Sequence, residues 1–491
     1  MATARRAEAE ARAQEIEAAR AKMQARKAAP ADQPEPAPQD PVRLQPVEKT
    51  TPRLSRETFR TSRLLDFCSR KELIAQTGHE SAEWSLVILK ELVDNALDAC
   101  EEAGVAPEIT VTVGQGFIRV SDNGPGLPAS TIDGVLDFSV RVSSREAYVA
   151  PDRGAQGNAL KTLVAMPYVL DGQRGRLEIA AQGVRHDITL GLDRIRQEPI
   201  VQHDKAPAPD VIAGTVVTIY WPDSSSSLLA DAEDRFLQIT EGYTVLNPHL
   251  TLTVDWFGEP RRVEATAPEW KKWRPSEPTS PHWYRPEHLA RLVSAQLARD
   301  ADQGRDRPVR ELVAGFRGLS ATAKQKVVLA ATGLGRAPLS ALVNGQDLDH
   351  AKVATLLATM QAESKPVPPE RLGIIGRAHV TTRFEALGCN METFKYTYKR
   401  GTTDGLPWVV ETAFAAREDE DADRRFIVGV NWSPGILNPF RSLGSIGQSL
   451  DAVLEQQRAG RDEPVVLLIH MAQPRVEYTD RGKSAVVVGG D

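Results

Sequence analysis

The chain has 491 residues, more than one hydrophobic core usually serves, so we expect two to four domains. Its composition is ordinary for a globular protein, and a formal net charge of −6 excludes a generally basic protein but not a local basic patch. Three scattered cysteines without a Cys-x-x-Cys pair are typical of a reducing cytoplasm, where we expect the protein. No apolar run reaches the roughly 18 residues of a membrane helix, and no signal peptide is visible, so we expect no membrane partner.

Residues 1–52 are predicted to form a flexible tail. Residues 1–28 alternate alanine with Arg, Lys and Glu, and residues 30–47 contain six prolines, so neither stretch offers an apolar face to a core. A partner-binding helix is the alternative for the first of these stretches.

The region that follows the tail mixes helices with the strands of a mostly antiparallel sheet, which indicates an α+β sandwich over residues 53–270. Helices are predicted over about 62–76, 82–103 and 228–245, and strands over 108–114, 117–122, 175–183, 184–191, 214–222, 249–256 and 261–267.

Two further domains are predicted after the sandwich. Residues 271–366 are expected to be all-helical, because amphipathic runs fill 284–363 and KPVPPERLG then marks a boundary. Residues 367–491 are expected to form an α/β domain. Its strands are predicted over 408–416, 424–432 and 464–472, with one helix at about 445–458 between the last two.

The segment KELVDNALDA, which begins at Lys90, predicts a helix with one polar stripe. Glu91, Asn95 and Asp98 follow one another at i, i+4 and i+7, so they share one face of an otherwise apolar helix. If the stripe lines a cavity, Glu91 can accept a proton from water and Asn95 can offer a neutral oxygen to a hard cation such as Mg²⁺. The alternative is a solvated face on which Lys90 and Asp94 form a surface pair.

The segment VSDNGPGLP predicts a strand that ends at Asp122, followed by a turn. A carboxylate in this place can accept a hydrogen bond from an exocyclic amine such as adenine N6, and Gly124 and Gly126 let the backbone approach a flat ring. The alternative is a plain turn, because Asp-Asn-Gly is common turn chemistry.

The segment DRGAQGNALKTL is a glycine-rich stretch that runs into a helix opening near Asn158. Free N–H groups and the positive end of the helix dipole favour an anion at such a helix start. Gly154, Gln156, Gly157 and Asn158 are therefore candidates for a phosphate cradle, and Lys161 adds positive charge on the first helical turn. The polar helix, the turn and this loop occur in close succession, which makes them stronger evidence together than singly.

These motifs resemble those of the GHKL ATPase superfamily, which groups gyrase, a heat-shock chaperone, histidine kinases and a mismatch-repair protein. Within it the chain is similar to the B subunit of topoisomerase VI, through ELVDNALDA, DNGPGLP, RGAQGNALKTL and LNPHLTLTV. The resemblance continues more weakly over nearly all of 60–488. It implies a GHKL-type α/β sandwich ATPase domain at 53–270, a helix-two-turns-helix-like domain at 271–366 and an α/β transducer-like domain at 367–491.

The resemblance also implies roles for single residues. Glu91 is the general base that orients water at the γ-phosphate of ATP, Asn95 is the Mg²⁺ ligand, and Asp122 reads adenine. Residues 154–161 form the ATP lid. Hydrolysis of this kind needs positioning and charge neutralisation more than covalent chemistry. The implied ATP-binding set is Asn95, Asp122, Gly124, Gly126, Gly154, Gln156, Gly157, Asn158, Ala159, Lys161 and Thr215, the last on the strand GTVVTIYWP.

The chain departs from the family pattern in three places. Ala159 stands where the lid usually has a third glycine. The family has a transducer lysine that reaches the γ-phosphate, but no lysine occurs between Pro439 and Pro464, and Lys483 lies farther along. The chain ends at Asp491, soon after the place where the family begins a long helix that docks the cleavage subunit.

We therefore expect an ATP-hydrolysing subunit of a topoisomerase VI-like (type IIB) complex. ATP would close two protomers as a gate, and a separate topoisomerase VI A-like cleavage subunit would act on double-stranded DNA. The alternative is a stand-alone GHKL clamp or switch, related to a mobile element or to defence, without topoisomerase activity. Ten Arg and Lys against five acids in 284–338 indicate either a DNA-backbone patch or a solvated surface. The densest part of this patch is Arg305, Arg307, Arg310, Lys324 and Lys326.

Overall fold

A computed structural model of the chain describes residues 68–136, 147–153, 159–193, 195, 198–274, 276–440, 448–478 and 485–486. The chain divides into two compact units, Met1–Arg60 and Thr61–Asp491, and all described residues belong to the second. The predicted tail therefore lies outside the described residues. Within the described residues, no helix is both long and apolar enough to cross a membrane.

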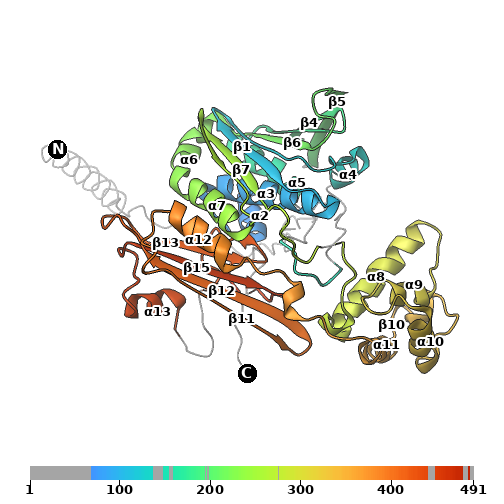
Figure 1. The fold of residues 1–491 in the computed structure, drawn as a ribbon. Helices are drawn as coiled ribbons and strands as arrows, with labels where there is room; N and C mark the ends of the chain where they lie inside the picture. The colour runs from blue at the N-terminus through green and yellow to red at the C-terminus, as the bar shows by residue number, and fades with distance from the viewer. Residues whose placement is uncertain are drawn as a thin grey trace, which may run out of the picture. The chain divides into compact units, whose positions relative to one another are not determined.

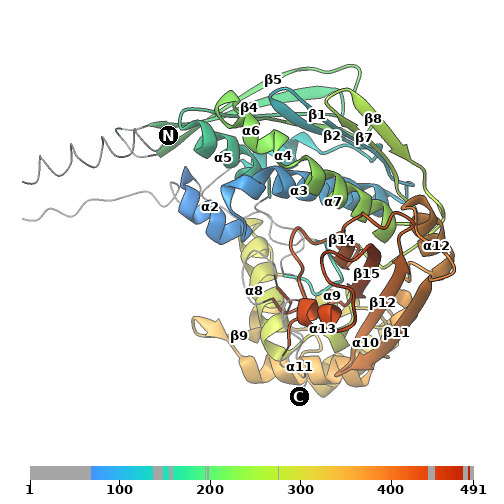
Figure 2. The ribbon, with the colours of Figure 1, turned by 90° about the vertical axis from the view of Figure 1, so that its left-hand side faces the viewer.

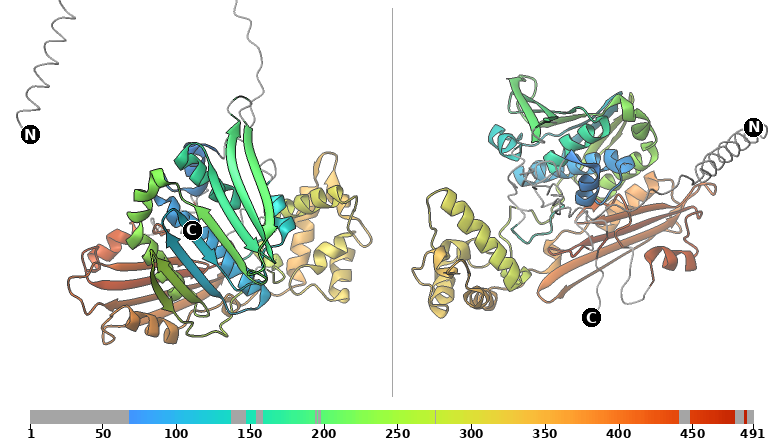
Figure 3. Two further views of the ribbon diagram at one scale, coloured as in Figure 1. Left: turned by 90° about the horizontal axis from the view of Figure 1, so that it is seen from above. Right: turned by 180° about the vertical axis from the view of Figure 1, so that it is seen from behind.

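The first part of the described chain is built on an eight-stranded sheet with the strand order β5-β4-β3-β6-β2-β1-β7-β8. Strands of this sheet, coloured blue to green, lie side by side in the left view of Figure 3. Only β1 and β7 pair in parallel, and all other neighbours in this sheet are antiparallel, as the sequence predicts. The strands are β1 Glu108–Gly114, β2 Phe117–Ser121, β3 Gly175–Ala181, β4 Val184–Asp193, β5 Glu198–Pro207, β6 Thr215–Tyr220, β7 Thr251–Trp256 and β8 Glu259–Val263.

Helices α3, α5 and α7 cover one face of this sheet (Figure 2). Their apolar sides share one core with the inward-facing residues of the strands, including the fully buried Trp84, Val111 and Phe236. Gly104 ends α3 in the left-handed conformation that favours glycine, with φ of 71°. The helices of this part are α2 Arg70–Thr77, α3 Trp84–Ala103, α4 Ala129–Val135, α5 Ala159–Asp171, α6 Ser226–Ala230 and α7 Glu233–Leu246.

Strand β5 is absent from the elements predicted by sequence. Its residues read EPIVQHDKAP, with a proline near each end, and half of its side chains are polar. Such a sequence is tolerated because β5 is an edge strand that pairs with β4 alone. The pattern of apolar alternation that reveals a half-buried strand is therefore missing.

Helices α8 to α11 form a second group (Figure 1). A separate core lies among them, around Leu289, Val313 and Leu356. The prediction of an all-helical segment missed one short hairpin, in which Val343 pairs with Leu348. The elements are α8 Pro286–Asp302, α9 Val309–Ala314, α10 Thr322–Ala331, β9 Val343–Asn344, β10 Asp347–Leu348 and α11 His350–Ala362.

The last part contains a five-stranded sheet with the order β11-β12-β15-β13-β14. Strands β13 and β15 are parallel and the other pairs are antiparallel. Strand β11 and helix α12 were not predicted. Strand β11 (KYTYKRGTT) is a polar edge strand, and α12 (RAHVTTRFEA) lacks a continuous apolar stripe. The elements are α12 Arg377–Ala386, β11 Lys395–Thr403, β12 Leu406–Ala416, β13 Arg425–Val430, β14 Ser433–Pro434, α13 Leu450–Gln456 and β15 Val465–Ala472.

Short 3-10 helices complete the described secondary structure. They span Ser81–Glu83, Asp223–Ser225, Pro281–Trp283, Leu339–Leu342 and Pro369–Arg371.

Candidate functional site

The polar stripe of α3 divides into an accessible part and a buried part. Asn95 is exposed and Glu91 is half-buried, although the apolar residues around them are buried. Asp98, one turn farther along, is only 3% exposed. The accessible part of the stripe therefore consists of one carboxylate and one amide, which lie at i and i+4 on the same side of the helix.

Asp98 belongs to an ion network rather than to the accessible part of the stripe. The guanidinium of Arg153 donates to Asp98 Oδ1 at 2.7 Å and to both carboxylate oxygens of Glu101 at 2.7 Å. All three side chains are buried. Burial raises the pKa of Glu101, but the positive charges of Arg153 and Lys272 outweigh it and hold that pKa well below its usual value. Sequence reasoning missed Arg153, although it directly precedes the glycine-rich loop.

The same network connects elements that are far apart in sequence. Lys272 Nζ lies 2.8 Å and His249 Nε2 lies 3.0 Å from the Glu101 carboxylate. Lys272 also lies over the ring of Trp432, at 4.7 Å from its centroid. Glu101 thus joins the end of α3 to the segment before α8 and to the turn between β13 and β14.

A second polar junction lies beside the stripe. Lys90 donates to Asp94 at 3.0 Å, so the i, i+4 pair forms, but Asp94 is only 6% exposed. Tyr243 of α7 donates to Asp94 Oδ1 at 2.9 Å, and Ser433 of β14 donates to Asp94 Oδ2 at 2.7 Å and contacts Lys90. The interpretation of Lys90 and Asp94 as an ordinary surface pair is therefore wrong. They connect α3 to the last sheet.

Asp122 follows the end of β2, where its side chain folds back onto the turn. Its Oδ1 accepts hydrogen bonds from the backbone N–H groups of Gly124 at 2.8 Å and Thr215 at 3.3 Å. Burial raises the pKa of Asp122, and the two N–H groups oppose that rise. The structure thus brings together Asp122, which directly follows β2, and Thr215, the first residue of the neighbouring strand β6, and two hydrogen bonds hold the carboxylate.

Close packing explains the glycines around this carboxylate. At Gly124 a Cβ atom would lie 2.9 Å from Asp122 Oδ1, and at Gly126, with φ of +82°, it would lie 2.9 Å from Gln182 Cγ. Gly214, which is not among the predicted site residues, has φ of +77°, and a Cβ there would lie 2.0 Å from the carbonyl oxygen of Asp122. The Asp122 turn and the start of β6 therefore require glycine on both sides.

The predicted phosphate cradle lies largely outside the described residues. This holds for Gly154, Gln156, Gly157 and Asn158. Helix α5 begins at Ala159, close to the predicted start. Lys161, on the first turn of α5, is only 1% exposed, so its ammonium group lies inside the protein rather than on its surface.

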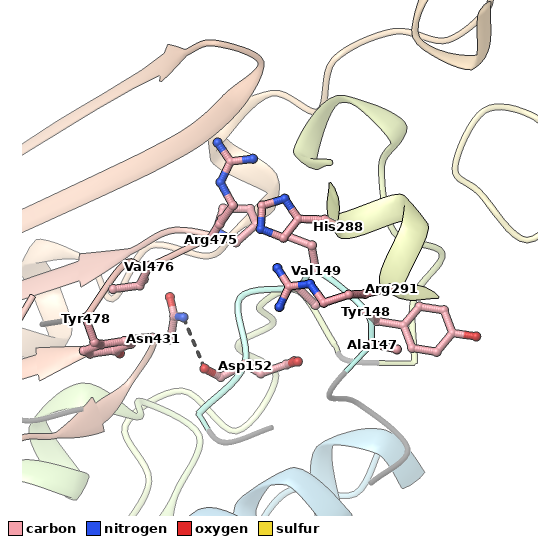
Figure 4. A pocket seen from close by; sticks show the side chains of 12 residues that line it. Ala147, Tyr148, Val149, Asp152, His288, Arg291, Asn431, Arg475, Val476 and Tyr478 are labelled. Carbon is pink, nitrogen blue, oxygen red and sulfur yellow. Dashed lines mark hydrogen bonds between the residues drawn. The ribbon is translucent and has the colours of Figure 1, made fainter. Parts of the chain in front are cut away.

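A cavity of about 250 Å³ lies beside the segment that precedes the glycine-rich loop (Figure 4). Its walls come from residues 147–150 and Asp152, from α8, from Asn431 and from the chain after β15. The Asn431 side-chain amide donates to the Asp152 carbonyl oxygen across it at 3.2 Å. Arg291 points toward the interior, whereas Arg475 points away and donates to the Trp283 carbonyl oxygen at 3.0 Å (Figure 4). The cavity therefore presents a positive side chain from α8, which no sequence motif indicated.

The basic residues of the second group are mostly engaged within the protein. Arg305 binds Glu311 at 2.7 Å, and Arg307 binds the buried Asp300 through two hydrogen bonds of 2.6 and 2.7 Å. Lys324 donates to the Glu363 carbonyl oxygen at 2.8 Å. Arg310 binds Gln325 at 2.8 Å, while Lys326 is exposed. These contacts connect the helices to one another and favour a structural role for most of the patch.

Parts of this chain are similar in sequence or structure to known proteins. Residues 84–224, which include α3 and the Asp122 turn, match the family described as "Histidine kinase-, DNA gyrase B-, and HSP90-like ATPase". Among solved structures, the B-subunit of DNA gyrase from Myxococcus xanthus has a TM-score of 0.38 and 12% identity, covering 87% of this chain and 89% of that one. The MutL ATPase domain of Aquifex aeolicus, complexed with ADP, has a TM-score of 0.29 and 12% identity, covering 78% and 90%.

Similar sequences occur among the B subunits of type 2 DNA topoisomerase 6. The protein of Archaeoglobus fulgidus is 23% identical over 418 residues, which are 82% of this chain and 66% of that protein. The protein of Methanosarcina mazei is 23% identical over 432 residues, 83% of this chain and 66% of that protein. The chain thus spans just under two thirds of the length of these relatives. Residues 84–224 therefore form a GHKL-type ATPase domain, and the chain is a distant homologue of the B subunit of topoisomerase VI.

Proposed function

We propose that the chain binds and hydrolyses ATP with Mg²⁺ at the accessible part of the α3 stripe and the Asp122 turn. The observation that carries this proposal is the exposure of Asn95, with Glu91 one turn away, in a stretch of α3 where every other residue from Leu92 to Asp98 is buried. An accessible carboxylate and amide on one side of such a stretch can contact a water molecule and a cation.

The adenine end of the site is assigned to Asp122, Thr215 and the glycines beside them. Two backbone N–H groups already bind Asp122 Oδ1, so Oδ2 is the oxygen that we assign to an exocyclic amine. Gly124 and Gly126 shape the turn next to it.

The phosphate end is assigned to α3 and to the start of α5. Mg²⁺, when bound, would neutralise phosphate charge, and its oxygen preference fits the Asn95 amide. Glu91 would accept the proton of an attacking water, which is the role of a general base. Gly154, Gln156, Gly157 and Asn158, with Ala159 and Lys161 on the first helical turn, remain our predicted ATP lid.

For the whole chain we propose a topoisomerase VI-like B subunit that dimerises as an ATP-dependent clamp. In this proposal 271–366 is the helix-two-turns-helix-like domain and 367–491 the transducer-like domain. The Glu101 and Asp94 junctions support coupling, since both connect the ATPase domain to β14 or the turn before it. ATP would drive closure through its higher affinity for the closed dimer. A separate A-like subunit would cleave double-stranded DNA.

A stand-alone ATPase clamp or switch is the second candidate. The internal pairing of Arg305, Arg307, Arg310 and Lys324 favours it, because these side chains are already occupied within the protein. Co-purification with an A-like cleavage subunit would decide for the first candidate.

Size-exclusion chromatography with light scattering tests the clamp. We expect a monomer without nucleotide and a dimer with a non-hydrolysable ATP analogue and Mg²⁺, because the analogue binds the closed form and cannot be hydrolysed. The matched sample is Asp122→Ala with the same analogue, which should stay monomeric. A wild-type mass that does not change while calorimetry shows bound analogue would exclude the clamp and leave the ATPase proposal standing.

A further inference from the structure

Three side chains with metal-binding atoms converge where α4 meets strands β4 and β5. Asp133 on α4, His186 on β4 and His203 on β5 each place one carboxylate oxygen or ring nitrogen within 4.8 Å of the other two. His186 is buried, His203 is half-buried and Asp133 is exposed, so the cluster opens to solvent on its carboxylate side. We propose that these three residues bind one transition-metal ion of the Zn²⁺ class.

The two strands bring the imidazoles onto one face of the sheet. His203 pairs with Ile188, two residues from His186, so the histidines are diagonal neighbours. Nδ1 of His186 lies 2.8 Å from Nε2 of His203, and Nδ1 of His203 lies 3.4 Å from Asp133 Oδ1. Tetrahedral zinc with bonds of about 2.0–2.2 Å keeps its ligand atoms about 3.4 Å apart. These two distances involve different nitrogens of His203, but one ligand atom of each residue lies within 4.8 Å of the other two, so binding an ion requires only a modest approach of the three side chains.

The contact between the two histidines suits a cation. Nδ1 of His186 and Nε2 of His203 face each other in a hydrogen bond, so one of these two nitrogens carries no proton and has a lone pair that can coordinate a metal. The ion would replace the hydrogen bond between the rings, and each ring would keep its proton on the nitrogen that does not coordinate. Lys205 competes for the carboxylate, at 3.0 Å from Asp133 Oδ1, but its side chain is 46% exposed and can turn into water.

The donor set selects the class of metal. Two imidazole nitrogens and one carboxylate oxygen suit Zn²⁺ and similar transition metals, whereas Mg²⁺ and Ca²⁺ prefer oxygen ligands. A water molecule would fill the fourth position on the open side. Because α4 follows the Asp122 turn in the chain, the ion would fasten that helix to the edge of the sheet. The inference does not depend on ATP binding.

Calorimetric titration of the full chain with ZnCl₂, using protein purified without a histidine tag, tests the site. We expect one ion per chain. His203→Gln and Asp133→Asn should each weaken binding by more than about 10-fold, since each removes a ligand. His350→Gln should bind as the wild type does, because His350 is exposed and, among the residues that the structure describes, belongs to no group of three such ligands. Lys205→Met should bind at least as tightly as the wild type, because it removes the competing cation.

Thermal unfolding of the same proteins provides an independent readout. Zn²⁺ should raise the unfolding temperature of the wild type and of His350→Gln, and should raise that of Asp133→Asn less at the same Zn²⁺ concentration, because binding to the folded state alone stabilises it. Asp133 is exposed, so its variant keeps the test valid even if His203→Gln does not fold. No saturable Zn²⁺ binding by the wild type, or unchanged affinity in Asp133→Asn, would overturn the proposal.

Discussion

Replacing Glu91 with alanine should lower ATP turnover by about 10²–10⁴-fold and leave ATP binding close to that of the wild type. In our assignment the Glu91 carboxylate accepts a proton from the attacking water and makes no contact that holds the nucleotide in the ground state. Loss of a general base typically lowers a rate by about 10²–10⁴-fold. Steady-state phosphate release gives the turnover, and calorimetry with Mg²⁺ and a non-hydrolysable analogue gives the affinity.

Glu102→Ala is the matched control for this experiment. Glu102 is an exposed carboxylate on the same helix, α3, and stands about three turns, roughly 16 Å, farther along than Glu91. The Glu102→Ala variant should hydrolyse ATP at the wild-type rate. If Glu91→Ala also hydrolyses ATP at that rate, the assignment of the base is wrong. If Glu91→Ala loses binding as well as turnover, Glu91 holds the nucleotide rather than the water.

Replacing Glu101 with glutamine should destabilise the protein by about 3–5 kcal/mol, the usual result when one partner of a buried ion pair is removed. The neutral amide keeps the shape of the side chain but removes the negative charge that Arg153 and Lys272 share. Both cations are buried, so water cannot replace the lost charge. Urea-induced unfolding of wild type and variant measures the difference.

The pH dependence of this effect follows from the ionisation of Glu101. Its pKa in the folded protein lies well below the ordinary 4.5. The contribution of ionised Glu101 to the free energy of unfolding is therefore fully present above pH 4.5. It is lost as the pH falls through the lower pKa that Glu101 has in the folded protein. Glu101→Gln should lack this dependence. Glu102→Gln, one residue along and exposed, should unfold like the wild type. If Glu101→Gln lowers the free energy of unfolding by less than about 1 kcal/mol, Glu101 does not stabilise the protein through its ion pairs with Arg153 and Lys272.

The sequence predicts best what local chemistry determines. Helix α3 and the turn after β2 are identifiable because their side-chain spacing and glycines act within a few residues, and β1 has the predicted bounds. The second strand of the site, β6, could be placed next to Asp122 only through the family resemblance.

Contacts between distant segments could not be predicted in the same way. Arg153 and Glu101 are 52 residues apart, and Lys272 and Trp432 join them from still farther along the chain. The sequence predicted Asp94 as part of a surface ion pair with Lys90. Its other partners, Tyr243 in α7 and Ser433 in β14, are far away in sequence, so the local pattern does not indicate them. His186 and His203 became neighbours only through β5, an edge strand without an apolar signature.

Isothermal titration calorimetry with ATP and Mg²⁺ tests the central claim most directly. The account predicts one saturable site per chain for ATP and weaker binding of GTP, because Asp122 accepts a hydrogen bond from the amine of adenine where guanine has a carbonyl oxygen. Asp122→Ala should weaken ATP binding by at least about 10-fold, as loss of a hydrogen bond to a charged group does. Asp210→Ala, at an exposed position, should bind as the wild type does. Absence of ATP binding by the wild type, or full affinity in Asp122→Ala, would contradict the account.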